Sequence, residues 1–153
     1  MKKVGAKMKK LNFIGIGGAT NIELGGNSCY LKDDDNLLVI DMCEGATERL
    51  EKEDVFKGVK NIYVIITHTH FDHVAGLGVF IWYCNFYLNI SPKIIYSKFK
   101  YKNHIKKLLR LTDVDKKYFE FIKSLYSFRF YCWRGCDLLV LGSFDASGYN
   151  WRI

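Results

Sequence analysis

In this 153-residue chain, a buried-strand pattern runs directly into a cluster of histidines, and this junction restricts the fold more than any other segment. The apolar run 61–66 is typical of a strand inside a core. His68, His70, Asp72 and His73 follow it and include three of the protein's four histidines. Imidazole and carboxylate groups crowded at a strand end are typical of a transition-metal site. The alternative is an incidental histidine-rich loop, which the scarcity of histidine elsewhere disfavours.

Short strand and helix patterns lie on both sides of this junction. Strands are expected at 28–32 and 37–41, and the polar turn 33–36 between them predicts a hairpin. The segment 47–54 is typical of a short polar helix, and 93–96 of another strand.

Two further helices and one apolar segment are expected downstream. The segment 74–90 is at the lower length limit for a membrane span, but its position after the histidines favours a buried helix and no membrane association. Residues 98–111 have helical periodicity. The stretch 112–115 resembles a capping box that opens another helix. That helix would point four apolar side chains inward, namely Tyr118, Phe119, Phe121 and Ile122.

The histidine run has the form HxHxDH, which resembles the signature of the metallo-β-lactamase superfamily. The likeness continues in a glycine turn at 11–18, in the segments 26–31 and 37–45, and at 76–78, so that it covers about residues 8–123. The resemblance implies an α/β fold, namely the N-terminal half, or somewhat more, of an αββα sandwich. Residues 1–153 are accordingly expected to form a single but incomplete domain.

The resemblance also implies two divalent metal ions, with zinc expected and manganese or iron as alternatives. His68 and His70 would bind the first ion, and Asp72 and His73 the second. Asp72 would in addition be catalytic, because it would orient the nucleophile and assist proton transfer. Asp41, at a neighbouring strand end, is expected either to hydrogen-bond a ligand histidine or to cap the turn before Glu44.

The family supplies further ligands that have no clear counterpart in this chain. His104 and Asp145 are the remaining candidates. Lysines surround His104 and disfavour a bound cation, so the alternative is an imidazole on a helix surface. Asp145 follows a strand-like run, and the alternative is an ordinary turn carboxylate.

Charge and cysteine content bear on partners and compartment. Residues 1–90 carry 10 Lys/Arg and 11 Asp/Glu, a net charge of −1, whereas residues 91–153 carry 13 and 5, a net charge of +8. Such a basic half permits a polyanionic partner. The five cysteines are odd in number and scattered, which argues against a disulfide framework and predicts a cytoplasmic protein.

The composition changes near residue 124. All 18 lysines precede that position, and none lies in 124–153. One interpretation is that 124–153 is foreign to the parent domain, for example through a shifted reading frame. The other is a genuine C-terminal hairpin that pairs 127–132 with 137–141.

Three functions follow as predictions. The first is a metal-dependent hydrolase that cleaves a phosphodiester or related ester of a small molecule, nucleotide or nucleic acid through a metal-bound hydroxide. The second is a catalytically incompetent remnant of such a domain, with exposed apolar surface open to a partner or a second copy. The third is a basic nucleic-acid-binding module without catalysis.

Overall fold

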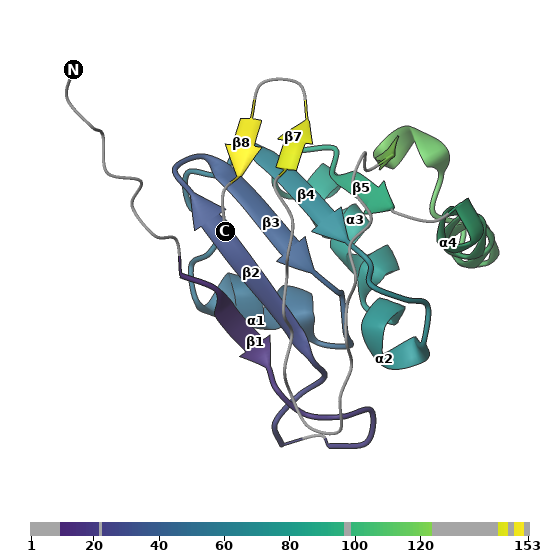
Figure 1. The fold of residues 1–153 in the computed structure, drawn as a ribbon, viewed down its shortest axis with the longest axis horizontal. Helices are drawn as coiled ribbons and strands as arrows, with labels where there is room; N and C mark the ends of the chain where they lie inside the picture. Colours follow the sequence, from purple (N-terminus) through teal and green to yellow (C-terminus); the bar gives the residue numbers. More distant parts are fainter. Residues whose placement is uncertain (1–9, 22, 97–98, 124–143, 147–148, 152–153) are drawn as a thin grey trace.

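A six-stranded sheet in the order β1-β2-β3-β4-β5-β6 organises the protein (Figure 1). The computed structural model describes residues 10–21, 23–96, 99–123, 144–146 and 149–151. The six strands are β1 (Asn12–Gly15), β2 (Ser28–Asp33), β3 (Asn36–Ile40), β4 (Asn61–Ile65), β5 (Lys93–Tyr96) and β6 (Glu120–Lys123). Strand β2 runs antiparallel to both β1 and β3, and the strands β3 to β6 run parallel to one another.

Each parallel connection passes through a helix, as parallel strands require. Helix α1 (Ala46–Lys52) joins β3 to β4. The short helix α2 (Phe71–Val74) and the longer α3 (Leu77–Phe86) join β4 to β5, and α4 (Phe99–Leu111) joins β5 to β6. Because the strands follow one another in chain order, the carboxyl ends of β3 and β4 lie side by side. The histidine cluster and Asp41 begin at these two ends.

Strand residues alternate between two apolar faces of the sheet. On one face the buried strand residues form a single core with helix residues such as Leu50, Phe80 and Ile105. The strand members of this core are Leu37, Val39, Ile62, Val64 and Ile94. The other face carries a separate buried cluster of Cys29, Leu31, Leu38, Ile40, Tyr63, Ile65 and Ile95. The near-continuous apolar strands therefore reflect a sheet that is buried on both faces.

Most of the predicted elements are confirmed. The hairpin is β2–β3, the polar helix is α1, the strand before the histidines is β4, and β5 and α4 lie where the sequence placed them. The apolar segment 74–90 contains the buried part of α3, with Phe80, Ile81 and Cys84 fully buried. One row of α3 nevertheless stays exposed, at Val79, Trp82 and Phe86.

The helix predicted to open at 112–115 is wrong. Asp113 has a left-handed φ of 55°, which ends α4, and Asp115 accepts a hydrogen bond from the Lys117 backbone N–H in a single 3₁₀ turn, η1 (Lys116–Tyr118). The chain then enters β6, where Phe121 packs against one core and Ile122 against the other. Over so short a segment, apolar residues that point to both faces of a strand resemble the apolar face of a helix.

The C-terminal prediction falls largely outside the described residues. The hairpin predicted to pair 127–132 with 137–141 lies entirely outside the described residues. A separate antiparallel pair is formed by β7 (Phe144–Ala146) and β8 (Tyr149–Trp151). Within the described part of the chain, no helix combines the length and apolar character needed to cross a membrane.

Candidate metal centre

The parallel register of β3 and β4 brings Asp41 beside the start of the segment 67–73, which follows β4 and is called the histidine loop below. Ile40 pairs with Ile65, and the Asp41 backbone N–H donates to the Ile65 carbonyl at 2.8 Å. Asp41 then takes a left-handed φ of 60°, a conformation that Asp and Asn tolerate better than most residues. This turn directs the buried Asp41 carboxylate toward the loop that follows β4.

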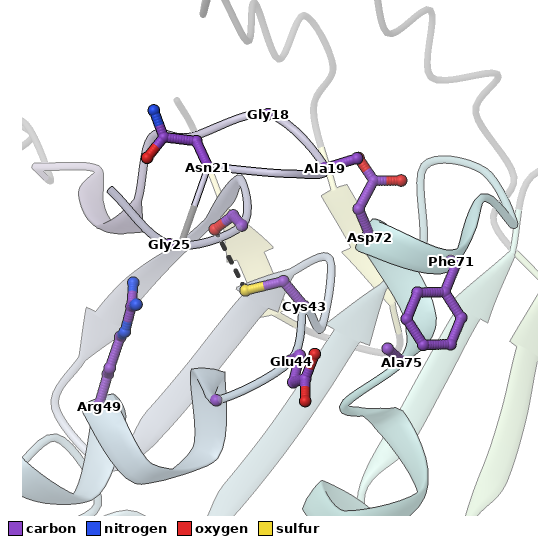
Figure 2. A pocket seen from close by; sticks show the side chains of 12 residues that line it. Gly18, Ala19, Asn21, Gly25, Cys43, Glu44, Arg49, Phe71, Asp72 and Ala75 are labelled. Atoms are coloured by element: carbon purple, nitrogen blue, oxygen red, sulfur yellow. Dashed lines mark hydrogen bonds between the residues drawn. The ribbon is translucent and has the colours of Figure 1, made fainter. Parts of the chain in front are cut away.

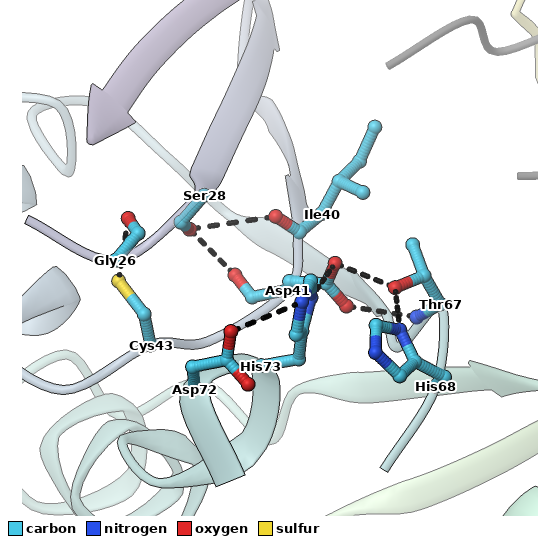
Figure 3. A network of polar contacts seen from close by, with 9 residues as sticks. All are labelled: Gly26, Ser28, Ile40, Asp41, Cys43, Thr67, His68, Asp72 and His73. Carbon is cyan, nitrogen blue, oxygen red and sulfur yellow. Dashed lines mark hydrogen bonds and ion pairs between the residues drawn. The ribbon is translucent and has the colours of Figure 1, made fainter. Parts of the chain in front are cut away.

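The Asp41 carboxylate accepts three hydrogen bonds from that loop (Figure 3). Its Oδ1 accepts from the Thr67 backbone N–H at 2.8 Å. Its Oδ2 lies 2.7 Å from both Thr67 Oγ1 and His73 Nδ1. With only 3% of Asp41 exposed, these partners replace the water that the charge has lost on burial. A proton on His73 Nδ1 would leave Nε2 of a neutral ring as the free lone pair.

The remaining histidines and Asp72 surround this ring. The His68 ring centroid is 3.9 Å from that of His73 and 4.5 Å from that of His70. His73 Nε2 is 3.5 Å from Asp72 Oδ2. Thr67 Oγ1 also lies 3.0 Å from His68 Nδ1, so Thr67 joins the Asp41 carboxylate to a second imidazole. Four of the predicted side chains are therefore brought together.

Electrostatics differ between the two inner histidines. Burial lowers the pKa of His68, and the neighbouring His73 and His70 lower it further against the opposing effect of Asp41. Burial also lowers the pKa of His73, but the hydrogen bond and charge of Asp41 and the charge of Asp72 outweigh it, so that the net shift is upward. A neutral His68 has a free ring nitrogen near neutral pH, which is the form that binds a metal.

The donor set suits a divalent transition metal, although the side chains approach one another in pairs. Three imidazoles and one carboxylate are the ligand types that zinc, manganese and iron accept. Among the residues that the structure describes, no three His, Cys, Asp or Glu side chains converge in the manner of a metal site. The chemistry of the donors thus fits such an ion, while a full coordination sphere would need side-chain movement or further ligands.

The two additional candidates, His104 and Asp145, differ in their relation to this group. His104, on α4, is exposed and its Nδ1 is 3.0 Å from Thr69 Oγ1, between the two histidines of the HxH pair. Asp145 lies in β7, where its backbone pairs with Asn150. The structure thus brings His104 to the edge of the histidine loop through Thr69, and it shows no such link for the described backbone of Asp145.

Sequence reasoning gave no role to Thr67, Ser28 or Cys43. Ser28 Oγ donates to the Asp41 carbonyl at 2.6 Å, and Cys43 Sγ donates to the Gly26 carbonyl at 3.1 Å. Thr67 lies two residues after the end of β4, so a parallel pairing of 37–41 with 61–66 would have indicated its contact with Asp41. No local pattern indicates the other two, since their partners are distant in sequence.

Close backbone approaches fix the turn at Cys43. A Cβ atom added at Gly26 would lie 2.5 Å from Cys43 Cβ, and one added at Gly76 would lie 2.2 Å from the Cys43 carbonyl oxygen. Real Cβ atoms essentially never come this close. Gly26 and Gly76 therefore serve the packing of three backbone segments around Cys43.

A pocket of about 180 Å³ adjoins Asp72 (Figure 2). It lies between the glycine turn that precedes β2, the start of α1, and α2. Arg49 reaches from α1 to the glycine turn, donates to the Ile14 carbonyl at 3.1 Å and lies against Gly25, where a Cβ would clash with the guanidinium. Gly25 also has a positive φ of 66°, so both space and backbone conformation require glycine there.

Solved structures show the same fold. The chain is similar to the short form of human tRNase Z at 23% identity with a TM-score of 0.55. It is also similar to the metallo-β-lactamase fold protein YhfI from Bacillus subtilis (19%, TM-score 0.58) and to a diphosphatase of the PhnP family (18%, TM-score 0.56). The matches cover 76%, 75% and 79% of this chain. This confirms the predicted α/β architecture of a metallo-β-lactamase-like domain.

These structures are longer than the matched chain, which spans only 43%, 45% and 54% of their lengths. A search of curated proteins found no significant match. The family model described as "Anti-Pycsar protein Apyc1" matches residues 9–127. Because that match spans most of the chain and includes the whole histidine loop, this protein belongs to the anti-Pycsar Apyc1 family of metallo-β-lactamase-fold proteins.

Proposed function

We propose that this protein is a metal-dependent hydrolase of phosphodiesters or related esters. The observation that carries the proposal is the Asp41–His73 hydrogen bond at 2.7 Å, set within the contacts of His68, His70 and Asp72. A carboxylate that fixes a histidine through Nδ1 leaves Nε2 for a metal, an arrangement common to zinc enzymes. Two of the similar structures are by name a tRNase and a diphosphatase, which favours a phosphate ester as substrate.

In this proposal, His68 and His70 hold one divalent ion, and Asp72 and His73 hold a second. Zinc is the expected metal, with manganese or iron as alternatives. When bound, such ions lower the pKa of a coordinated water and stabilise negative charge on the reacting ester.

The chain's own groups prepare this site. Asp41 keeps His73 in one orientation, and Thr67 links the same carboxylate to His68. Asp72, whose Oδ2 lies 3.5 Å from His73 Nε2, would accept a proton from the attacking nucleophile. The buried Asp41 and Thr67 exclude water from the back of the site.

The test is turnover of bis(4-nitrophenyl) phosphate by purified protein loaded in turn with zinc, manganese or iron, with metal per chain measured on the same samples. We expect metal-dependent release of nitrophenol that Asp72→Asn and His70→Ala each abolish. Asp54→Asn is the matched control, because Asp54 is an exposed carboxylate outside the site and has a left-handed φ of 54° that Asn tolerates. Full turnover by Asp72→Asn would refute the proposal.

A second candidate is a remnant that binds metal weakly and does not turn over substrate. One observation favours it: among the residues that the structure describes, no three potential ligand side chains converge in the manner of a metal site. It predicts at most one metal ion per chain and no turnover with any of the three metals. About two ions per chain together with turnover would exclude it.

A further inference from the structure

The Thr67 hydroxyl lies between the Asp41 carboxylate and the His68 ring (Figure 3). Its Oγ1 is 2.7 Å from Asp41 Oδ2 and 3.0 Å from His68 Nδ1. Thr67 and Asp41 are both buried, and the Thr67 backbone N–H donates to Asp41 Oδ1 at 2.8 Å. The backbone of Thr67 thus holds its hydroxyl in place, where one proton has two polar neighbours.

The position of this proton follows from the kinds of group around it. An ionised carboxylate only accepts hydrogen bonds, whereas a hydroxyl donates one and can accept two. If Thr67 donated to His68 Nδ1, its Oγ1 would face Asp41 Oδ2 at 2.7 Å with no proton between the two oxygens. A buried site disfavours such a contact, because neither oxygen could turn to water instead. Thr67 therefore donates to Asp41 and accepts from His68, which places the His68 proton on Nδ1.

His73 reaches the same state through a direct contact. Its Nδ1 is 2.7 Å from Asp41 Oδ2, which is an acceptor, so Nδ1 carries a proton here too. In a neutral imidazole with its proton on Nδ1, only Nε2 has a lone pair for a metal ion. His73 Nε2 lies 3.5 Å from Asp72 Oδ2, the other predicted ligand of the same ion. One buried carboxylate thus determines the metal-binding nitrogen of two histidines.

The other hydroxyl of the histidine loop has different contacts. Thr69 Oγ1 lies 3.0 Å from His104 Nδ1. Within the part of the chain that the structure describes, no hydrogen bond joins the Thr69 side chain to Asp41 or His68. A hydroxyl in this loop is therefore not sufficient by itself, and Thr69 offers a matched comparison for Thr67.

We propose that Thr67 is a positioning residue that extends the orienting effect of Asp41 to His68, so that His68 presents Nε2 to the first metal ion. Asp41 orients His73, a ligand of the second ion, without an intermediate group. The assignment of the two histidines to separate ions rests on the proposed function, whereas the proton positions rest on the hydrogen bonds alone. Removal of the Thr67 hydroxyl should therefore weaken one of the two metal positions and spare the other.

The first measurement is the tautomer of His68 in metal-free protein, from long-range proton–nitrogen NMR correlations of isotope-labelled histidine rings in the presence of EDTA. About pH 8.5 is suitable, because it is well above the ordinary pKa of histidine and the ring is neutral. The chain has four histidines, so His68→Gln identifies the His68 signals. We expect the Nδ1–H form in the unaltered chain and in Thr67→Ser. We expect Thr67→Val to lower the ratio of Nδ1–H to Nε2–H by about fivefold or more.

The second measurement is zinc affinity, from titration against a chromophoric chelator, with one binding step expected for each ion. We expect Thr67→Val to weaken one step by about tenfold. The other step should stay within about twofold of its value in the unaltered chain. Thr67→Ser retains the hydroxyl, so both of its steps should also stay within about twofold. The matched control is Thr69→Val, which removes a hydroxyl from the same loop and should alter neither step.

Several results would overturn the proposal. An Nε2–H form of His68 in the unaltered chain would do so, and this measurement needs no Thr67 variant, so it decides the matter even if Thr67→Val does not fold. A zinc affinity of Thr67→Ser as low as that of Thr67→Val would show that packing of the threonine methyl group, and not the hydroxyl, supports the site. Equal weakening of both steps, or the same loss in Thr69→Val, would show a general loosening of the loop.

The failure of this proposal is distinguishable from that of the hydrolase, because the tautomer is measured without metal or substrate. A chain with the expected tautomer and two zinc steps that never turns over bis(4-nitrophenyl) phosphate would retain the role of Thr67 and lose the hydrolytic assignment. A chain with the expected tautomer that binds no zinc would lose both. Turnover by a chain whose His68 carries its proton on Nε2 would retain the hydrolase and remove the role of Thr67.

Discussion

The candidate metal centre has a buried half and an exposed half, and the two differ in how many hydrogen bonds hold their side chains in place. Asp41, Thr67 and His73 are buried and linked by hydrogen bonds of 2.7 to 2.8 Å. His70 and His104 are exposed. Within the described part of the chain, the His104 side chain hydrogen-bonds Thr69, and no side-chain hydrogen bond holds His70. The folded chain alone fixes the first half. The second half would gain its order mainly from a bound ion, so stability and metal affinity should respond to different substitutions.

Removal of the Asp41 carboxylate should give the largest effect. Asp41→Ala leaves the Thr67 and His73 donors without their acceptor and places alanine in a left-handed backbone conformation. We expect a loss of about 3 kcal/mol in the free energy of unfolding, measured by urea denaturation of metal-free protein. Asp41→Asn keeps the shape and tolerates the backbone, so it should lose less. Equal losses of stability in Asp41→Ala and Asp41→Asn would mean that lost hydrogen bonds explain the whole effect. The left-handed backbone conformation would then contribute nothing.

Loss of an exposed ligand should leave the fold intact and remove the response to metal. For the unaltered chain, zinc at roughly 100 times its dissociation constant should add about 2.7 kcal/mol to the free energy of unfolding. We expect His70→Ala to change the metal-free value by less than about 0.5 kcal/mol and to lose most of that zinc increment. An undiminished increment in His70→Ala would mean that His70 binds no ion.

The two threonines allow the same chemical change in both halves. Thr67→Val removes a hydroxyl that contacts both Asp41 Oδ2 and His68 Nδ1, and it should cost about 1 to 2 kcal/mol of stability. Thr69→Val removes the hydroxyl that contacts His104 near the surface, and it should cost less than about 0.5 kcal/mol. Urea denaturation of the two variants side by side measures the difference. Similar costs would contradict the division into two halves.

His104→Gln should have the smallest effect. Its one hydrogen bond is exposed, so we expect a change below about 0.5 kcal/mol in the free energy of unfolding and an intact zinc increment. The measurement is the same denaturation series with and without zinc. A zinc increment as small as that of His70→Ala would show that His104 is a ligand.

The sequence predicted the buried half less completely than the exposed half. The histidine run and β4 follow from local pattern, because one strand and one loop contain them. The contact between Asp41 and Thr67 depends on the pairing of β3 with β4, which joins residues 26 positions apart and has no local signal. Ser28 and Cys43 were missed for the same reason.

The region after α4 shows a different difficulty. Thr112 to Asp115 has the letters of a capping box, but Thr112 Oγ1 donates back to the carbonyls of Leu108 and Leu109, and Asp113 leaves the helical region. The next apolar residues then pair with β5. A capping pattern alone does not indicate whether the residues that follow it form a helix or pair with the edge strand of a sheet.

The crowding at Cys43 has a consequence for how the protein can vary. The turn from β3 to α1, the start of β2 and the start of α3 meet there without room for one methyl group at Gly26 or Gly76. The three segments must therefore shift together or not at all. A shift of any one of them would be transmitted to Asp41, so few substitutions should be tolerated at Gly26 and Gly76, although neither residue has a side chain that could bind or react.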